Sequence, residues 1–151
     1  MEAMSNSFKI TPIGGLGQIG ANMLLIETDN ESTLVDCGIL FPKDDNFNID
    51  YLLPDYSVLP DNCEQIILTH GHEDHIGGIT DLWLELRCPL YTTPFTAAVI
   101  RRKLTQSIIK ERVPMKIQSP GGRFKVTDSF DCEFIPITHS TVESQCVVIR
   151  T

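Results

Sequence analysis

The feature that most constrains this chain is a cluster of histidines in one short segment. Three of its four histidines lie in the run Thr69-His70-Gly71-His72-Glu73-Asp74-His75, and the fourth, His139, follows a separate apolar run. Neutral imidazole and carboxylate groups are the ligands that zinc prefers outside all-cysteine sites. A solvated polar loop with incidental histidines is the alternative, but the clustering favours a metal site.

The flanking pattern predicts where this segment lies. Residues 65–69 (Gln-Ile-Ile-Leu-Thr) have the character of a strand. Apolar residues recur every three or four positions from Ile76 onward, which predicts a helix. The first two histidines, two positions apart in an extended segment, should point the same way. The aspartate and the third histidine follow a bend and should face a second position, so one loop could serve two metals, as suits metal-assisted hydrolysis.

Two glycines, Gly77 and Gly78, follow the histidine run. They are explained equally well as a flexible start to the helix or as small residues required where backbones pack closely under a metal loop.

Length and composition exclude several classes of protein. At 151 residues the chain can form one domain with a core. It has no apolar run long enough to span a membrane and no secretory signal. Its five cysteines are widely spaced, with no Cys-x-x-Cys pair, so neither a disulfide framework nor a zinc ribbon is indicated and a reducing cytoplasm is expected.

The remaining pattern predicts a chain that is mostly β with two helices, of the α+β class. Residues 1–7 are expected to be a flexible leader and residues 8–151 one domain. A second helix should run from Pro94, capped by Thr93, to about Gln106. Residues 40–59, rich in Asp, Asn and Pro, should form a loop that covers one side of the site. Further strands are expected at residues 8–13, 22–28, 33–36, 89–92, 115–118, 123–126, 131–137 and 146–150.

Residues 15–20 (Gly-Leu-Gly-Gln-Ile-Gly) match the dinucleotide-binding fingerprint, and Asp36 lies at the expected later position. However, only residues 21–27 could form the required helix, which is too short to cross a parallel sheet, and they form an apolar run better suited to a strand. We therefore expect these glycines to shape a turn near the metal loop.

The charge distribution is uneven. The net charge is −8, which argues against nonspecific binding of nucleic acid by the chain as a whole, yet eight of the twelve basic residues lie between Arg101 and Lys125. This segment could follow a phosphate backbone, or it could be a solvated helix face and connector. The sequence favours neither.

Several motifs together carry a family resemblance. The run from Thr69 to Gly78, with Val35-Asp36-Cys37-Gly38 and Thr138-His139-Ser140, resembles the motifs of the metallo-β-lactamase superfamily. Residues 14–23 (Gly-Gly-Leu-Gly-Gln-Ile-Gly-Ala-Asn-Met) and 41–59 resemble ribonuclease J, an RNA-degrading branch that carries a β-CASP domain. The resemblance extends from about Phe8 to Arg150.

This resemblance implies an αββα sandwich of which the chain holds only the N-terminal half of the catalytic domain. It also implies a cytoplasmic, zinc-dependent ribonuclease that acts on RNA, with no membrane association and with self-assembly of the parent protein. His70, His72 and His139 would hold one zinc ion. Asp74 and His75 would help to hold a second, and Asp74 could orient the attacking water. Asp36 would fix the loop or a histidine tautomer, or would merely cap the turn after its strand.

Two departures from the family limit what is carried over. Thr141-Val142-Glu143-Ser144 stands where the family usually has a stretch like Ile-Pro-Asp-Ser. A metal-bridging aspartate and a further histidine, both later in family members, have no counterpart before Thr151. We therefore expect a fragment that is poorly active alone and holds at most one zinc ion firmly. A hydrolase of small thioesters or lactones, and a metal-binding module without chemistry, are the alternatives.

Half of a two-sheet sandwich would leave an apolar sheet face uncovered. We therefore also expect the chain to self-associate or to be disordered near its ends.

Overall fold

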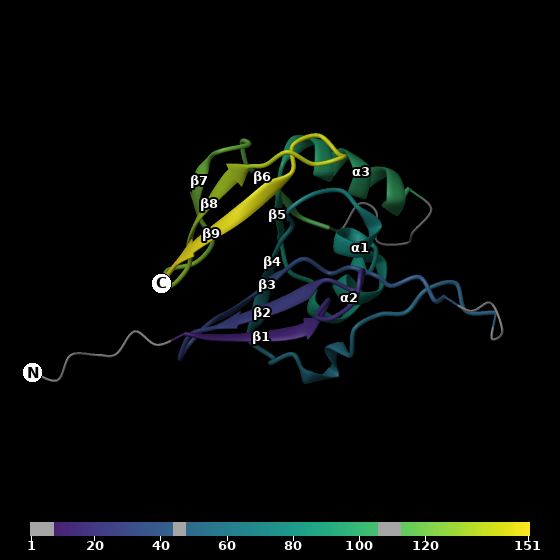
Figure 1. Cartoon of the computed structure of the whole chain (residues 1–151). Helices are drawn as coiled ribbons and strands as arrows, with labels where there is room; N and C mark the ends of the chain where they lie inside the picture. Colours follow the sequence, from purple (N-terminus) through teal and green to yellow (C-terminus); the bar gives the residue numbers. More distant parts are fainter. Residues whose placement is uncertain (1–7, 44–47, 106–112) are drawn as a thin grey trace, which may run out of the picture.

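The structure is a computed structural model that describes residues 8–43, 48–105 and 113–151. Two β-sheets form its centre (Figure 1). The larger sheet has six strands in chain order: β1 (Lys9–Gly14), β2 (Met23–Glu27), β3 (Ser32–Val35), β4 (Cys63–Ile67), β5 (Leu90–Thr92) and β6 (Met115–Ile117). The smaller sheet contains β7 (Arg123–Lys125), β8 (Asp131–Pro136) and β9 (Gln145–Arg150). All the expected strands are therefore present, with ends shifted by one or two residues.

The helices differ in detail from the prediction. The helix expected from Ile76 starts three residues earlier, as α1 (Glu73–Ile76), and continues after two glycines as α2 (Ile79–Leu86). Asp74 and His75 follow a bend at Gly71, as expected, but both already lie within α1. The second helix, α3 (Pro94–Leu104), begins where expected, and Gln106 lies outside the described residues.

Two smaller expectations also need correction. Thr93 is the N-cap residue of α3, but its hydroxyl donates to the Thr96 hydroxyl at 3.2 Å instead of accepting from a backbone N–H. The segment expected as a loop contains a short 3-10 helix, η2 (Tyr56–Val58), and a β-bridge between Leu40 and Leu52.

The elements form three layers, with the helices on one face of the six-stranded sheet and the smaller sheet on the other (Figure 1). The core under the helices is built from residues such as Leu34, Ile66, Ile79 and Ile100. A second core fills the space between the sheets, where Ile26 and Ile67 of the larger sheet pack with Phe124, Phe130 and Phe134. Burial of these side chains at about 1.5–3 kcal/mol each holds the sheets together.

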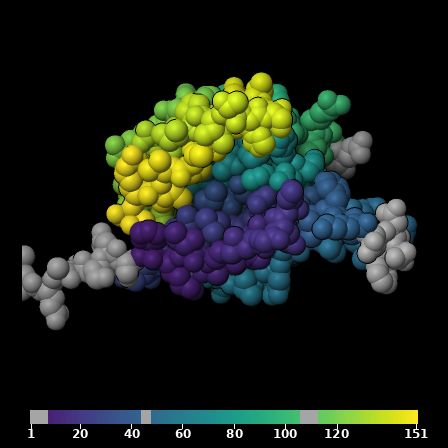
Figure 2. All heavy atoms as spheres, in the orientation of Figure 1, coloured from purple at the N-terminus to yellow at the C-terminus, as the bar shows by residue number. Residues whose placement is uncertain are grey.

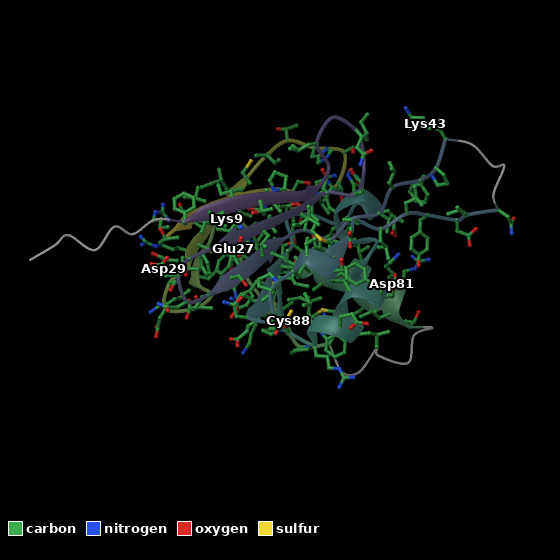
Figure 3. All side chains as sticks on the ribbon, turned by 90° about the horizontal axis from the view of Figure 1, so that it is seen from below. Lys9, Glu27, Asp29, Lys43, Asp81 and Cys88 are labelled. Carbon is green, nitrogen blue, oxygen red and sulfur yellow. The ribbon has the colours of Figure 1, made fainter. Side chains whose placement is uncertain are left out.

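The pairing of the first two strands shows the structural role of the glycine-rich turn between them. β1 and β2 are antiparallel partners, with Lys9 opposite Glu27 and their side chains paired at 2.9 Å (Figure 3). A dinucleotide fold requires a helix at this position, so that reading is excluded. The turn instead returns the chain to the metal loop, as expected: the N–H of Asn22 donates to the carbonyl oxygen of Asp74 at 3.1 Å.

The strand directions place the functional loops at one edge. β3, β4, β5 and β6 are parallel, so the carboxyl ends of β3, β4 and β5 lead into loops at the same edge of the sheet, the usual place for ligand sites in such sheets. Asp36 follows β3, the histidine run follows β4, and α3 follows β5. The loop after β8, which carries His139, closes over the same edge.

The smaller sheet covers only part of the larger one. Ile10 of β1 pairs with Ile26, and its side chain is 51% exposed. Figure 2 shows β9 and β1 on either side of a recess between the sheets. Among the described residues no helix is long and apolar enough to cross a membrane.

Candidate metal centre

Three histidines from two loops converge at the edge of the sheet. One ligand nitrogen from each of His70, His72 and His139 lies within 4.8 Å of the others, and His70 Nε2 is 3.2 Å from His72 Nδ1. The ring of His139 is 4.7 Å from each of the other two rings, centroid to centroid. His70 is buried, His72 is half-buried and His139 is exposed. The cluster, which we call site 1, is therefore built on the core and open to solvent on one side.

A second pair of ligands lies beside site 1. On α1, His75 Nε2 is 3.4 Å from Asp74 Oδ2, and the His75 ring is 4.0 Å from that of His70. Asp74 and His75, which we call site 2, thus face a position next to site 1. Two neighbouring groups of potential ligands are the kind of arrangement that holds a pair of metal ions in hydrolases.

Asp36 connects the two sites from behind. Its carboxylate accepts from His75 Nδ1 at 2.7 Å and from the backbone N–H of Thr69 at 2.9 Å. The Thr69 hydroxyl lies 2.9 Å from Asp36 Oδ2, the oxygen that also accepts from His75, and 2.9 Å from His70 Nδ1. If the Thr69 hydroxyl donates to Asp36, it accepts from the N–H at His70 Nδ1. His70 Nε2 then carries no proton, and its lone pair faces site 1.

Asp36 itself adopts a left-handed conformation, with φ 62°. Such a conformation costs a non-glycine residue free energy, although aspartate tolerates it better than most. The conformation turns the chain sharply at the end of β3 and directs the carboxylate at Thr69 and His75. Merely capping the turn does not account for contacts with Thr69 and His75.

Asn22 contacts site 2 and was not identified from the sequence as a site residue. Its side-chain amide donates to the Asp74 carbonyl oxygen at 3.0 Å and lies 3.2 Å from both Asp74 Oδ2 and His75 Nε2. It lies 52 residues before Asp74, so no local pattern reveals the contact. The available signals were its position just after the glycine-rich turn and its place in the stretch 14–23 that resembles ribonuclease J.

Glycines allow the backbones around site 2 to touch. A Cβ on Gly77 would lie 2.4 Å from the Glu73 carbonyl oxygen, and one on Gly78 would lie 3.0 Å from the Cys37 carbonyl oxygen. The N–H of Cys37 donates to the His75 carbonyl oxygen at 2.8 Å. Close packing thus accounts for both glycines, and Gly78 also stands at the start of α2 as its N-cap residue.

An apolar wall borders the histidines. A cavity of about 360 Å³ is lined by His72 and Asp74 on one side and by Ile19, Leu40 and Phe41 on the other. The segment after β3 therefore covers one side of the site, as expected.

Comparison with known proteins decides the family. The sequence profile described as "Metallo-beta-lactamase superfamily" matches residues 16–145. The chain belongs to this superfamily. Among curated proteins it is similar to ribonuclease J from Helicobacter pylori (strain ATCC 700392 / 26695), with 43% identity over 96% of this chain and 22% of that protein. Ribonuclease J from Synechocystis sp. is 40% identical over 97% of this chain and 24% of that protein. The chain thus spans about a quarter of the length of these relatives.

Solved structures support the same fold. The metallo-β-lactamase fold protein YhfI from Bacillus subtilis superposes with a TM-score of 0.65 at 20% identity, over 95% of this chain and 57% of that one. The expected αββα architecture, present here as a partial domain, is therefore confirmed.

The histidines of this metallo-β-lactamase domain differ in their affinity for protons. Burial, reinforced by the neighbouring His75, lowers the pKa of His70 to about 4. At neutral pH His70 is therefore neutral, the form that binds metals. Burial also disfavours the charged form of His75, but the hydrogen bond and charge of Asp36, together with Asp74, outweigh it and raise the pKa of His75.

The donor atoms fit a divalent metal. Two nitrogen ligands on a tetrahedral zinc ion lie about 3.4 Å apart, which matches the separation of His70 Nε2 from His72 Nδ1. Site 1 offers three imidazoles, enough for a zinc site with one open position, whereas site 2 offers one imidazole and one carboxylate.

The basic segment is divided over three elements. Arg101 and Arg102 are exposed on α3, whereas Lys103 pairs with Glu73 at 2.8 Å. On β7, Arg123 pairs with Asp131, and Lys125 pairs with Asp128 at 2.8 Å. Lys116 is exposed on β6, and Lys110 and Arg112 lie outside the described residues. Local acids thus offset part of the positive charge, and only the end of α3 presents adjacent exposed arginines within the described residues.

Proposed function

We propose that this chain is the metal-binding part of a zinc-dependent ribonuclease that hydrolyses RNA phosphodiester bonds. The observation that carries the proposal is the convergence of His70, His72 and His139 in a chain 43% identical to a ribonuclease J. The superfamily fold alone would not select RNA, since one fold hosts many activities.

In this proposal site 1 holds the first zinc ion. His70, neutral because its pKa is low, offers Nε2, and the Thr69 hydroxyl behind it fixes the tautomer. His72 offers Nδ1 from the same loop. His139 comes from the separate loop after β8 and completes the three ligands. Because His139 is exposed, the open position of the ion would face solvent and the incoming substrate.

Site 2 holds the second zinc ion through Asp74 and His75, with Asp36 as the orienting group behind His75. When bound, the two zinc ions supply Lewis acidity, which lowers the pKa of a water and offsets the charge that develops on the phosphate. Asp74 of site 2 lines the same cavity as His72 of site 1 and has two carboxylate oxygens, so we assign it the further role of accepting a hydrogen bond from the attacking water and orienting it.

The isolated chain should hold one zinc ion well and the second weakly. Two ligands are fewer than the three that an open zinc site normally has. We propose that the parent protein supplies the missing ligands, including an aspartate that bridges the ions, and that the 151-residue chain alone cleaves RNA poorly or not at all. The widely spaced cysteines and the resemblance also lead us to place the parent enzyme in the cytoplasm as a homo-oligomer.

The proposal is tested on two proteins. Zinc titration of this chain should show about one tightly bound ion per molecule, and a chelator should lower its stability. The full-length protein, assayed with RNA and with a small thioester, should cleave RNA and lose this activity with the chelator.

Three results would contradict the proposal. A thioester or lactone hydrolysed in preference to RNA would support the alternative metallo-hydrolase. No stoichiometric zinc, with no effect of chelator, would point to a domain without metal chemistry. Strong chelator-sensitive cleavage of RNA by the 151-residue chain would refute the fragment hypothesis.

A further inference from the structure

His139 is the only ligand of site 1 that does not belong to the histidine run, and its loop needs a separate anchor. The loop spans residues 137–144, between β8 and β9. Residues 135–140 are exposed, so little burial holds this part of the chain. Figure 1 shows the loop reaching the beginning of α3. A ligand on an exposed loop binds a metal tightly only when other contacts keep it in place.

One contact joins this loop to the helix. Glu143 Oε2 accepts from the backbone N–H of Phe95 at 2.8 Å. Phe95 lies in the first turn of α3, an eleven-residue helix, where N–H groups have no partner within the helix. A carboxylate at this end is also favoured by the helix dipole. Thr93, the N-cap residue, does not provide this bond, because its hydroxyl is used by Thr96.

The helix that Glu143 caps is itself attached to the histidine run. α3 is tied to the histidine run by the pair between Lys103 and Glu73, and Gly71 lies against Val99. Glu143 therefore fixes its loop to a helix that already contacts Gly71 and Glu73, the chain neighbours of the other site 1 ligands.

Hydrogen bonds of Gln145, two residues after Glu143, also attach this end of the loop. The buried Gln145 donates from its backbone N–H to the Thr69 carbonyl oxygen at 3.1 Å, and its side-chain amide donates to the Glu143 carbonyl oxygen at 3.0 Å. Glu143 adopts a left-handed conformation, with φ 55°. This conformation lets its carbonyl group face Gln145 while its side chain faces α3.

We propose that Glu143 is a positioning residue for His139: by capping α3 it holds the loop so that the imidazole faces His70 and His72. The residue belongs to the stretch Thr141–Ser144, which departs from the family pattern. The inference rests on the proposed metal function of site 1, but the contact that carries it does not require a metal.

The test compares Glu143→Ala and Glu143→Gln with the wild-type chain. Glu85→Ala is the matched control, because Glu85 is also a glutamate and lies exposed near the end of α2 that is farther from α1. Loss of a helix cap should weaken zinc binding by about 3- to 10-fold in E143A, measured by competition with a chelator. The amide oxygen of E143Q can still accept, so its affinity should recover most of the loss. E85A should bind zinc like the wild type.

A second measurement works without metal. In the metal-free E143A chain, hydrogen exchange should be faster at the Phe95 amide and across residues 137–144, and unchanged in α2. Wild-type zinc affinity and wild-type exchange in E143A would overturn the positioning role. If the wild-type chain binds no zinc, the metal proposal fails, and the exchange data alone decide whether Glu143 holds the loop.

Discussion

Replacement of Gly38 by alanine tests most directly how the metal loop is supported. Gly38 follows Asp36 and Cys37 at the end of β3. A Cβ at this position would lie 1.6 Å from the carbonyl oxygen of Asp74 and 2.2 Å from its carbonyl carbon. Both are backbone atoms, so no side-chain rotation can relieve the overlap. The main chain at Asp74 would have to move by more than 1 Å, because interiors packed at crystal density cannot absorb such a contact.

The displacement affects stability and site 2 together. The Asp74 carbonyl oxygen accepts from the backbone N–H of Asn22 at 3.1 Å, and the N–H of Gly38 donates to the Asn22 carbonyl oxygen at 2.9 Å, so moving one of these segments strains the others. Overpacking of this kind costs about 3 kcal/mol when the contact is with backbone. With a urea dependence of about 2 kcal/mol per molar, the unfolding midpoint should fall by roughly 1.5 M. Binding of a second metal ion should be lost.

Gly71→Ala is the matched control, because it lies in the histidine run itself. Its Cβ would meet only side-chain atoms, those of Val99 at 3.4 Å and of Phe95 at 3.8 Å, which are ordinary contacts. We expect the midpoint of G71A to change by less than about 0.5 M, because the contact is ordinary and alanine restricts the unfolded chain. Urea unfolding followed by circular dichroism and zinc titration measure both effects. G38A with the stability and metal binding of G71A would refute the reasoning.

Three further outcomes are expected. Asp36→Asn should lower the pKa of His75, because it removes the charge 2.7 Å from Nδ1; an unchanged histidine titration by NMR would contradict this. In the metal-free chain His70 should titrate near pH 4. Because the pKa of His70 is lower in the folded than in the unfolded chain, the free energy of unfolding should fall by roughly 2 kcal/mol as the pH drops from about 6.5 to 4, after allowing for solvent access. His70→Asn should remove this part of the pH dependence. An identical pH dependence in H70N would exclude the role of His70. The chain should self-associate through the uncovered face near Ile10, and Ile10→Asp should reduce this; a monomer at all concentrations in sedimentation would count against it.

The sequence predicts those parts of the site that are local. His70, His72, Asp74 and His75 lie within six residues, so their proximity follows from chain geometry before any fold is known. His139 lies far along the chain, and it was assigned to the site because Thr138-His139-Ser140 resembles a motif of the superfamily. The strands were predictable for a similar reason, since alternation and apolar runs are short-range signals.

The remaining parts depend on contacts between distant segments. Asn22 reaches Asp74 across 52 residues, and Glu143 reaches Phe95 across 48. Neither residue type is distinctive by itself, because asparagine and glutamate are common on surfaces. The early start of α1 was missed because His72, its N-cap residue, makes no side-chain cap bond. Tertiary contacts, including the bond from Cys37 to His75, fix that turn instead.

Asp36 explains why the two sites should not behave independently. One carboxylate accepts directly from His75 of site 2 and, through the Thr69 hydroxyl, controls the proton on His70 of site 1. A metal ion held by Asp74 and His75 would draw electron density from His75 and strengthen its bond to Asp36. The carboxylate would then be a weaker acceptor for Thr69, and His70 would be a weaker ligand. Occupation of one site should therefore change the affinity of the other through a single buried side chain, and this coupling should disappear in D36N.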